Sequence, residues 1–233
     1  MNSSLSKQVP SRRQFLQMGA AGTLAGLLTS GLELTAPLPA RAQSNLTPDA
    51  ALAELMEGNK RFTTGKSTAH DHDLAILKQN TVDKQEPFAA VLSCADSRVP
   101  VELVFDQSIG HIFVTRVAGN VITPEIIASL EYGAAVLGTK VILVMGHSNC
   151  GAVSATIKGK SVPGQISALF PHIQPAVDQA GPNLEAATKA NAKIQATLLS
   201  QASTVVSDLV KESKLKVVAG YYELGTGAVT LVG

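Results

Sequence analysis

Residues 140–145 read Lys-Val-Ile-Leu-Val-Met and lead directly into Gly146-His147-Ser148-Asn149-Cys150-Gly151. The segment 140–145 is the most apolar of three apolar segments of strand length, and the other two are residues 88–93 and 111–117. An uninterrupted apolar segment is typical of a strand that is buried on both faces of a parallel sheet. These three segments therefore predict three strands of an α/β fold with a parallel sheet.

Helical patterns alternate with these strands. Thr47-Pro48-Asp49 combines a capping hydroxyl, a proline for the first helical position and an acid in the first turn, so we expect a helix that begins there and ends at Thr63-Thr64-Gly65. The alternation of strands and helices indicates crossover connections and a mainly parallel sheet. Further helices are expected over residues 73–79, 124–137, from near Cys150, 164–178 and 184–212.

The last two apolar segments, residues 215–222 and 228–232, are separated by Leu224-Gly225-Thr226-Gly227. A short connection that contains glycine favours a hairpin between neighbouring strands. The last strand is therefore expected to be an antiparallel edge strand.

The first 42 residues have a different character. Arg12-Arg13 is followed by an uncharged segment of small and apolar residues and then by Ala40-Arg41-Ala42, the pattern of an export signal with a cleavage site. The paired arginines make it a twin-arginine-type signal peptide, so we expect residues 1–42 to be removed and residues 43–233 to form the functional domain. The expected location is the periplasm, or the thylakoid lumen if the source has thylakoids. An uncleaved membrane anchor is the alternative, although this segment is short and rich in glycine for a membrane span.

The composition argues against several classes of protein. Because 45% of the 233 residues are hydrophobic, the chain has the material for a real core and is not intrinsically disordered. The net charge is +1, and the chain without residues 1–42 keeps 15 basic and 17 acidic side chains. Since a nucleic-acid-binding protein normally carries a basic field, no nucleic-acid partner is expected. Two cysteines cannot form a scaffold of several disulfides.

Reactive side chains follow two of the predicted strands. Ser93-Cys94-Ala95-Asp96-Ser97-Arg98 comes directly after the strand at 88–93, and residues 146–151 come directly after the strand at 140–145. The carboxyl ends of parallel strands are where open α/β sheets place their ligand sites. Cys94, His147 and Cys150 offer two thiolates and one imidazole, a ligand set that zinc accepts in tetrahedral geometry. Three protein ligands leave one position open, as in a catalytic zinc site.

One acidic and one basic residue near Cys94 fit the same predicted zinc site. Asp96 is suited either to be a fourth ligand or to be a partner for zinc-bound water. Arg98 can pair with the Asp96 carboxylate in a charge-assisted, fork-like contact.

A disulfide bridge is the competing interpretation of the two cysteines. An exported protein meets an oxidising compartment, where two cysteines commonly pair. Asp96, Arg98 and His147 beside Cys94 and Cys150 favour a metal site instead. Because a twin-arginine signal directs folded proteins, zinc loaded before export would protect both thiolates.

Cys-x-Asp-x-Arg at residues 94–98, followed by His-x-x-Cys-Gly at residues 147–151, resembles the motif of the β-class carbonic anhydrases. The resemblance extends from about Pro48 to Val232. It includes Glu57-Gly58-Asn59-Lys60-Arg61-Phe62, Arg116-Val117-Ala118-Gly119-Asn120, Ser129-Leu130-Glu131-Tyr132 and Gly220-Tyr221-Tyr222.

The resemblance implies a role for each motif residue. Cys94, His147 and Cys150 match the ligands of one Zn²⁺ per chain. Asp96 and Arg98 match the catalytic aspartate–arginine pair, which holds together in an open form, whereas in a closed form Asp96 is itself the fourth ligand. The allosteric members that favour the closed form use a tryptophan, and this chain has none, so the open form is expected.

Three further positions match the substrate pocket. Gln85 matches a glutamine whose amide lines the CO2 pocket, often across a dimer interface. Phe113 matches an apolar wall position, and Gly151 matches a glycine whose backbone N–H faces the substrate.

The implied activity is the zinc-dependent, reversible hydration of carbon dioxide to bicarbonate and a proton by zinc-bound hydroxide, the reaction of a carbonate dehydratase, which is a carbon–oxygen lyase. The implied partners are CO2 or bicarbonate and further copies of the chain in a homodimer or tetramer. The expected fold is a three-layer α/β structure with a mostly parallel four-stranded sheet in the order 2-1-3-4 and an antiparallel edge strand. Two alternatives remain: hydrolysis of carbon disulfide or carbonyl sulfide on the same fold, and a non-catalytic zinc-binding protein.

Overall fold

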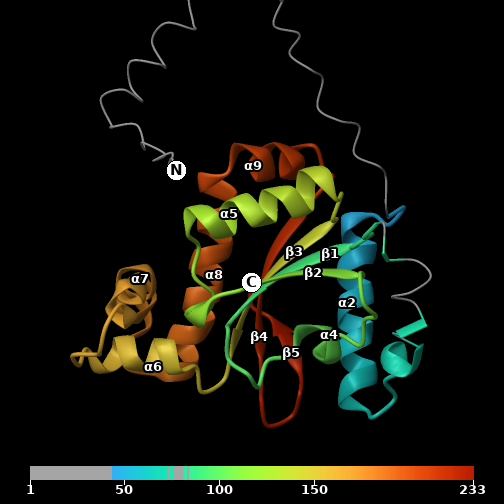
Figure 1. Cartoon of the computed structure of the whole chain (residues 1–233). Coiled ribbons are helices and arrows are strands. Elements are labelled where there is room, and N and C mark those ends of the chain that lie inside the picture. The colour runs from blue at the N-terminus through green and yellow to red at the C-terminus, as the bar shows by residue number, and fades with distance from the viewer. Residues whose placement is uncertain (1–43, 73, 76–80, 83) are drawn as a thin grey trace, which may run out of the picture. The chain divides into compact units, whose positions relative to one another are not determined.

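A five-stranded sheet forms the centre of the computed structural model, which describes residues 44–72, 74–75, 81–82 and 84–233 (Figure 1). The strand order is β2-β1-β3-β4-β5, in which the first four strands are parallel and β5 is antiparallel to β4. The predicted order and the predicted antiparallel edge are both confirmed. The strands are β1 (Ala89–Ser93), β2 (Ile112–Arg116), β3 (Val141–His147), β4 (Lys216–Tyr222) and β5 (Val229–Leu231).

The two central strands explain why the sequence is so apolar there. Every residue of β1 and β3 is buried. Val141, Leu143 and Met145 of β3 join one core cluster, whereas Ile142 and Val144 join a second cluster on the opposite face. Because side chains alternate along a strand, a strand covered on both faces is apolar along most of its length.

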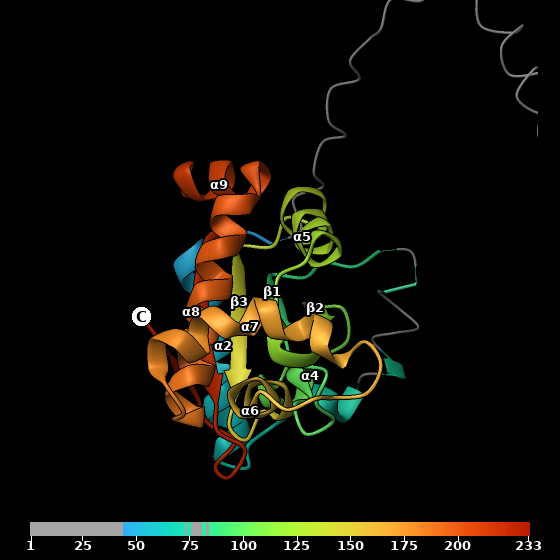
Figure 2. The ribbon, with the colours of Figure 1, turned by 90° about the vertical axis from the view of Figure 1, so that its left-hand side faces the viewer.

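Helices cover both faces, so the predicted three layers are confirmed (Figure 1). Helices α2 and α4 contribute to the first core cluster, and α5 and α8 contribute to the second. Helix α6 begins just beyond the carboxyl end of β3, and α7 packs against α6 and α8 (Figure 2). The helices are α2 (Pro48–Thr63), α4 (Val101–Val104), α5 (Pro124–Glu131), α6 (Gly151–Lys158), α7 (Phe170–Ala180), α8 (Leu184–Ala202) and α9 (Thr204–Lys211), with short 3₁₀ segments at Ala69–His72, Ala118–Asn120 and Ile166–Leu169.

Helix α2 begins as its sequence predicts. The Thr47 hydroxyl accepts a hydrogen bond from the Ala50 N–H at 3.2 Å, and Pro48 is the first helical residue. The helix ends at Thr63, followed by Thr64 and then by Gly65 in the left-handed conformation. Local capping chemistry therefore fixes both ends of α2.

The expected single helix over residues 184–212 is wrong, because the structure divides it at Ser203. This residue has an extended backbone (φ −105°, ψ 113°), so it ends α8 and caps α9. Its hydroxyl accepts from the Val206 N–H at 3.0 Å and donates to Glu131 Oε1 at 2.6 Å. A serine side chain that bonds the backbone competes with helix propagation, which explains the break.

Two other predicted helices differ in detail, and one helix was not predicted. The helix that starts at Pro124 continues past α5 as a π turn over Tyr132–Val136, and the expected helix at 164–178 is a 3₁₀ segment followed by α7. Helix α4 was not predicted.

Residues 73 and 76–79 of an expected helix, and the whole expected signal at 1–42, lie outside the described residues. Among the described helices, none has both the length and the hydrophobicity that crossing a bilayer requires.

Candidate metal centre

The two reactive segments meet at the carboxyl ends of neighbouring strands. Strands β1 and β3 are adjacent, with Ser93 opposite Met145, so Cys94 directly follows β1 and His147 ends β3. The ligand atoms of Cys94, His147 and Cys150 all lie within 4.8 Å of one another, and all three side chains are buried. The structure thus brings together the three side chains that the sequence predicts as ligands.

His147 presents one ring nitrogen to this group. Its Nδ1 lies 2.9 Å from the Ser148 carbonyl oxygen, which makes Nδ1 the protonated donor and leaves Nε2 with a free lone pair. Among the hydrogen bonds of the described residues, the buried Nε2 has no partner. An unsatisfied buried polar atom is costly, and here it faces two sulfurs, which is the donor set of a zinc site. The residues present therefore fit a zinc ion.

The two thiols differ in acidity. Hydrogen bonding with the Cys150 thiol is the largest cause, and with the Gly119 N–H at 3.3 Å from Sγ it lowers the pKa of Cys94 well below its usual value. Hydrogen bonding to Cys94 and burial raise the pKa of Cys150. Both cysteines are free, so the structure does not contain the disulfide that competed with the metal site.

Asp96 and Arg98 form the predicted pair beside the three ligands. Arg98 Nε and Nη2 donate to Asp96 Oδ1 and Oδ2 at 3.0 and 2.8 Å, and the Arg98 backbone N–H donates to Oδ1 at 2.9 Å. These contacts, with that of the Arg98 side chain the largest, hold the pKa of Asp96 well below its usual range. Asp96 Oδ2 lies 3.9 Å from His147 Nε2, so an ionised carboxylate borders the centre. This paired arrangement is the one expected for the open form.

Sequence reasoning missed four contacts that hold the two loops. Arg98 Nη2 donates to the Asn149 carbonyl at 3.3 Å and so links one loop to the other. Asn149 has a φ of 55°, in the left-handed region that asparagine tolerates better than most residues. Arg116 binds the carbonyls of Cys94 and Asp96, and Gly119 binds the Cys94 sulfur. For Arg116 and Gly119 the sequence held two signals: residues 116–120 lie at the end of a strand and belong to the family resemblance.

Of the three residues expected in the substrate pocket, only Gly151 adjoins the metal centre. Gly151 is the first residue of α6, next to Cys150, and the space beside its α-carbon is open. Phe113 lies on β2, half-buried, with its ring centroid 6.2 Å from that of Tyr132. Gln85 is exposed and precedes the amino end of β1, whereas Cys94 follows its carboxyl end. The structure does not bring Gln85 to the metal centre of its own chain.

Known proteins resemble this chain in sequence and in fold. The family model described as carbonic anhydrase matches residues 89–229. Carbonic anhydrase 2 of Mycobacterium tuberculosis is 31% identical over 195 residues, which cover 80% of this chain and 94% of that protein. The β-carbonic anhydrase CafA of Aspergillus fumigatus is 25% identical with a TM-score of 0.63, over 78% of this chain and 89% of that chain.

The likeness in fold extends further. The tetrameric β-carbonic anhydrases of Sordaria macrospora match with a TM-score of 0.61 at 20% identity, over 78% of this chain and 96% of that chain. The family model covers more than half of the present chain, and the mycobacterial relative is matched over nearly its full length. The chain therefore belongs to the β-class carbonic anhydrase family.

Proposed function

We propose that this protein catalyses the reversible hydration of carbon dioxide to bicarbonate and a proton, with one Zn²⁺ per chain held by Cys94, His147 and Cys150. One observation carries the proposal: two sulfurs and an imidazole nitrogen lie within 4.8 Å of one another, beside an ion-paired aspartate. Membership of the carbonic anhydrase family supports the same reaction.

Each residue of the site has a distinct task. A zinc ion on three protein ligands lowers the pKa of a bound water from about 15.7 toward about 7, which supplies a nucleophile at neutral pH. The Asp96 carboxylate accepts a hydrogen bond from the attacking nucleophile. This contact orients the nucleophile so that a lone pair on its oxygen points toward the carbon of CO2. Arg98 keeps this carboxylate ionised and in place. A new C–O bond gives bicarbonate, and a proton passes to solvent.

The substrate pocket is proposed to need a second copy of the chain. The Gly151 N–H at the start of α6 has no intrahelical partner, so it is free to donate to a substrate oxygen. Phe113 is proposed as an apolar wall, and because it pairs in register with Ala90 near the amino end of β1, it would line the pocket of another subunit. Because Gln85 lies at the opposite end of β1 from Cys94, its amide can serve a pocket only from another subunit. A homodimer is therefore the proposed minimum unit, and a tetramer is compatible with it.

Stopped-flow CO2 hydration tests the activity directly. Purified protein with one zinc per chain should hydrate CO2, lose this activity when a chelator removes the metal, and regain it when zinc is returned. Carbonyl sulfide and carbon disulfide are assayed side by side with CO2. Faster turnover of either sulfur compound, or zinc-loaded protein that is inactive toward CO2, would refute the proposal.

Export through a twin-arginine signal is proposed from the sequence of residues 1–42. The test is the double substitution Arg12→Lys, Arg13→Lys, which should leave the precursor in the cytoplasm, while wild-type protein is recovered outside it. Cell fractionation followed by amino-terminal sequencing measures both location and cleavage after Ala42. Normal export of the double variant would point to another route.

A further inference from the structure

The Arg116 side chain binds the short segment that carries both the proposed ligand Cys94 and the aspartate of the metal centre, Asp96. It is the last residue of β2, and its register partner is Ser93, the last residue of β1. From there its Nε donates to the Cys94 carbonyl at 3.0 Å, and its Nη2 donates to the Asp96 carbonyl at 2.5 Å. One planar guanidinium thus bridges the two carbonyls on either side of Ala95.

Each of the two bridged carbonyls has one other hydrogen bond. Residues 94–96 have no regular secondary structure. The Ser93 hydroxyl donates to the Cys94 carbonyl at 3.3 Å, and the Val99 N–H donates to the Asp96 carbonyl at 3.1 Å. Among the hydrogen bonds of the described residues, the Arg116 side chain is the one donor that reaches both carbonyls. It therefore fixes the Cys94 and Asp96 backbones relative to each other.

Arg116 and Arg98 have different tasks in the same loop. Arg98 holds the Asp96 carboxylate, whereas Arg116 holds the backbone from which that carboxylate projects. The Arg116 side chain is exposed, so its contacts contribute little to global stability. Small displacements of a reacting group, however, cost much more in rate than in stability.

We propose that Arg116 is a positioning residue for CO2 hydration: it clamps Cys94-Ala95-Asp96 so that the Asp96 carboxylate stays beside the metal centre while Cys94 remains a ligand. This inference rests on the proposed function. The clamp needs a planar group with two donors in fixed directions, which arginine has and lysine lacks.

The test compares Arg116→Ala and Arg116→Lys with wild type. Both variants should keep one zinc per chain and an unchanged KM, while kcat falls about tenfold to a hundredfold. Because Arg116 is exposed, its removal leaves a space that a small ion from solvent can enter. Guanidinium ion, well below denaturing concentrations, should restore much of the kcat of Arg116→Ala, and methylammonium should not.

A second measurement does not depend on activity. In cobalt-substituted protein, Arg116→Ala should shift the visible absorption bands of the metal, because the Cys94 ligand is displaced, and guanidinium should shift them back. If zinc-loaded wild type fails to hydrate CO2, the proposed function is wrong, and this spectrum still tests the clamp.

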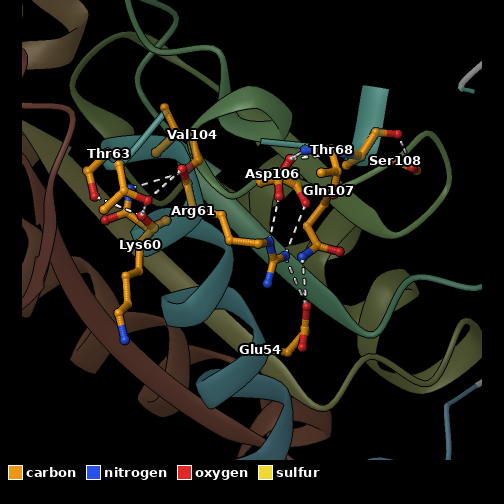
Figure 3. Close-up of polar contacts among 12 residues, drawn as sticks. Glu54, Lys60, Arg61, Thr63, Thr68, Val104, Asp106, Gln107 and Ser108 are labelled. Carbon is orange, nitrogen blue, oxygen red and sulfur yellow. Dashed lines mark hydrogen bonds and ion pairs between the residues drawn. The ribbon is translucent and has the colours of Figure 1, made fainter. Parts of the chain in front are cut away.

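Arg61 provides the matched control. It also bridges acceptors, with Nε 2.6 Å from Asp106 Oδ2 and Nη2 3.4 Å from Glu54 Oε1, but none of its contacts belongs to the metal centre (Figure 3). Arg61→Ala should lower stability and leave kcat, the cobalt spectrum and the response to guanidinium as in wild type. The inference is overturned by wild-type kcat in Arg116→Ala, by a loss that guanidinium does not reverse, or by an equal guanidinium response in Arg61→Ala.

Discussion

Two aspartates ten residues apart lie in clusters that differ in how far the protein itself satisfies their hydrogen-bonding groups. The Asp106 side chain is fully buried, and it accepts from Arg61 Nε at 2.6 Å and from the Thr68 and Ala69 N–H groups at 2.9 and 3.0 Å (Figure 3). Around Asp96, by contrast, two buried thiols and the unpartnered His147 Nε2 face one another.

The difference separates a structural cluster from a functional one. A buried charge whose hydrogen bonds are all supplied by the protein needs nothing else, and it holds α2 to the loop after α4. Buried donors and acceptors that the protein leaves unmatched are expensive to keep, and they indicate a missing ligand. Changes at the Asp96 cluster should therefore affect metal and activity, whereas changes at the Asp106 cluster should affect stability alone.

The largest effect is expected from removal of a metal ligand. Cys150→Ala leaves one thiolate and one imidazole, so zinc content should fall from about one per chain to near zero, because such sites need three protein ligands. CO2 hydration should fall to the level of the metal-stripped protein. Metal analysis and stopped-flow kinetics on the same sample measure both. Full zinc content in this variant would mean that the ligand set is wrong.

Asp96→Asn should separate metal binding from turnover. The amide cannot carry the negative charge that accepts a hydrogen from the attacking water, so kcat should fall about 10²–10³-fold while zinc stays bound. Ser97→Ala, beside it in the same loop, serves as the control and should keep most of the activity. Wild-type turnover in Asp96→Asn would remove the proposed role of the carboxylate.

Asp106→Asn tests the structural half of the comparison. Loss of the charged acceptor should lower the free energy of unfolding by about 2 kcal/mol, with zinc content and kcat unchanged. Burial opposes ionisation of Asp106, but the contacts with Arg61, Ala69 and Thr68 outweigh it and lower its pKa in the folded state. The stabilisation is therefore complete above the unfolded pKa of about 4 and is lost as pH falls through the folded pKa.

Urea unfolding at several pH values measures this prediction. The difference between wild type and Asp106→Asn should be constant near neutral pH and shrink in acid. Glu54→Gln is the matched control, because Glu54 is partly exposed and its ion pair with Arg61 should contribute less than about 1 kcal/mol. A pH-independent difference would argue against the ionised state of Asp106.

The smallest effect is expected at Asn149, which joins the two loops through its backbone. Its φ of 55° is unfavourable for residues with an ordinary side chain, so Asn149→Ala should cost about 1 kcal/mol of stability, whereas Asn149→Gly should cost less. Both variants should keep zinc, because the Arg98 contact uses the backbone carbonyl. Equal stability of the two variants would show that the left-handed conformation is not strained.

Much of the sheet could be predicted from the sequence, because strands buried on both faces are apolar along most of their length, as residues 141–145 are. The ligands could be predicted too, since Cys94 and His147 stand where neighbouring strands end. The break at Ser203 combines a local cap on the Val206 N–H, which a serine can make, with a hydrogen bond to Glu131, 72 positions away, which depends on the tertiary structure. The same holds for Arg116, whose reach to Cys94 and Asp96 depends on the register of β1 against β2.

The pocket was the least predictable part. Gln85 stands nine residues before Cys94, and only the length and direction of β1 reveal that the two lie at opposite ends of a strand. A site that combines residues from two copies of the chain leaves no pattern within one sequence, so the position of Gln85 becomes informative only in three dimensions.

X-ray absorption at the zinc edge tests the central claim most directly, because it reports which atoms surround the ion in the purified protein. With about one zinc per chain, we expect two sulfur neighbours near 2.3 Å and a nitrogen near 2.0 Å, with an oxygen at the remaining position. Absence of zinc together with a mapped Cys94–Cys150 disulfide, or zinc surrounded only by nitrogen and oxygen, would contradict the metal centre and the activity inferred from it.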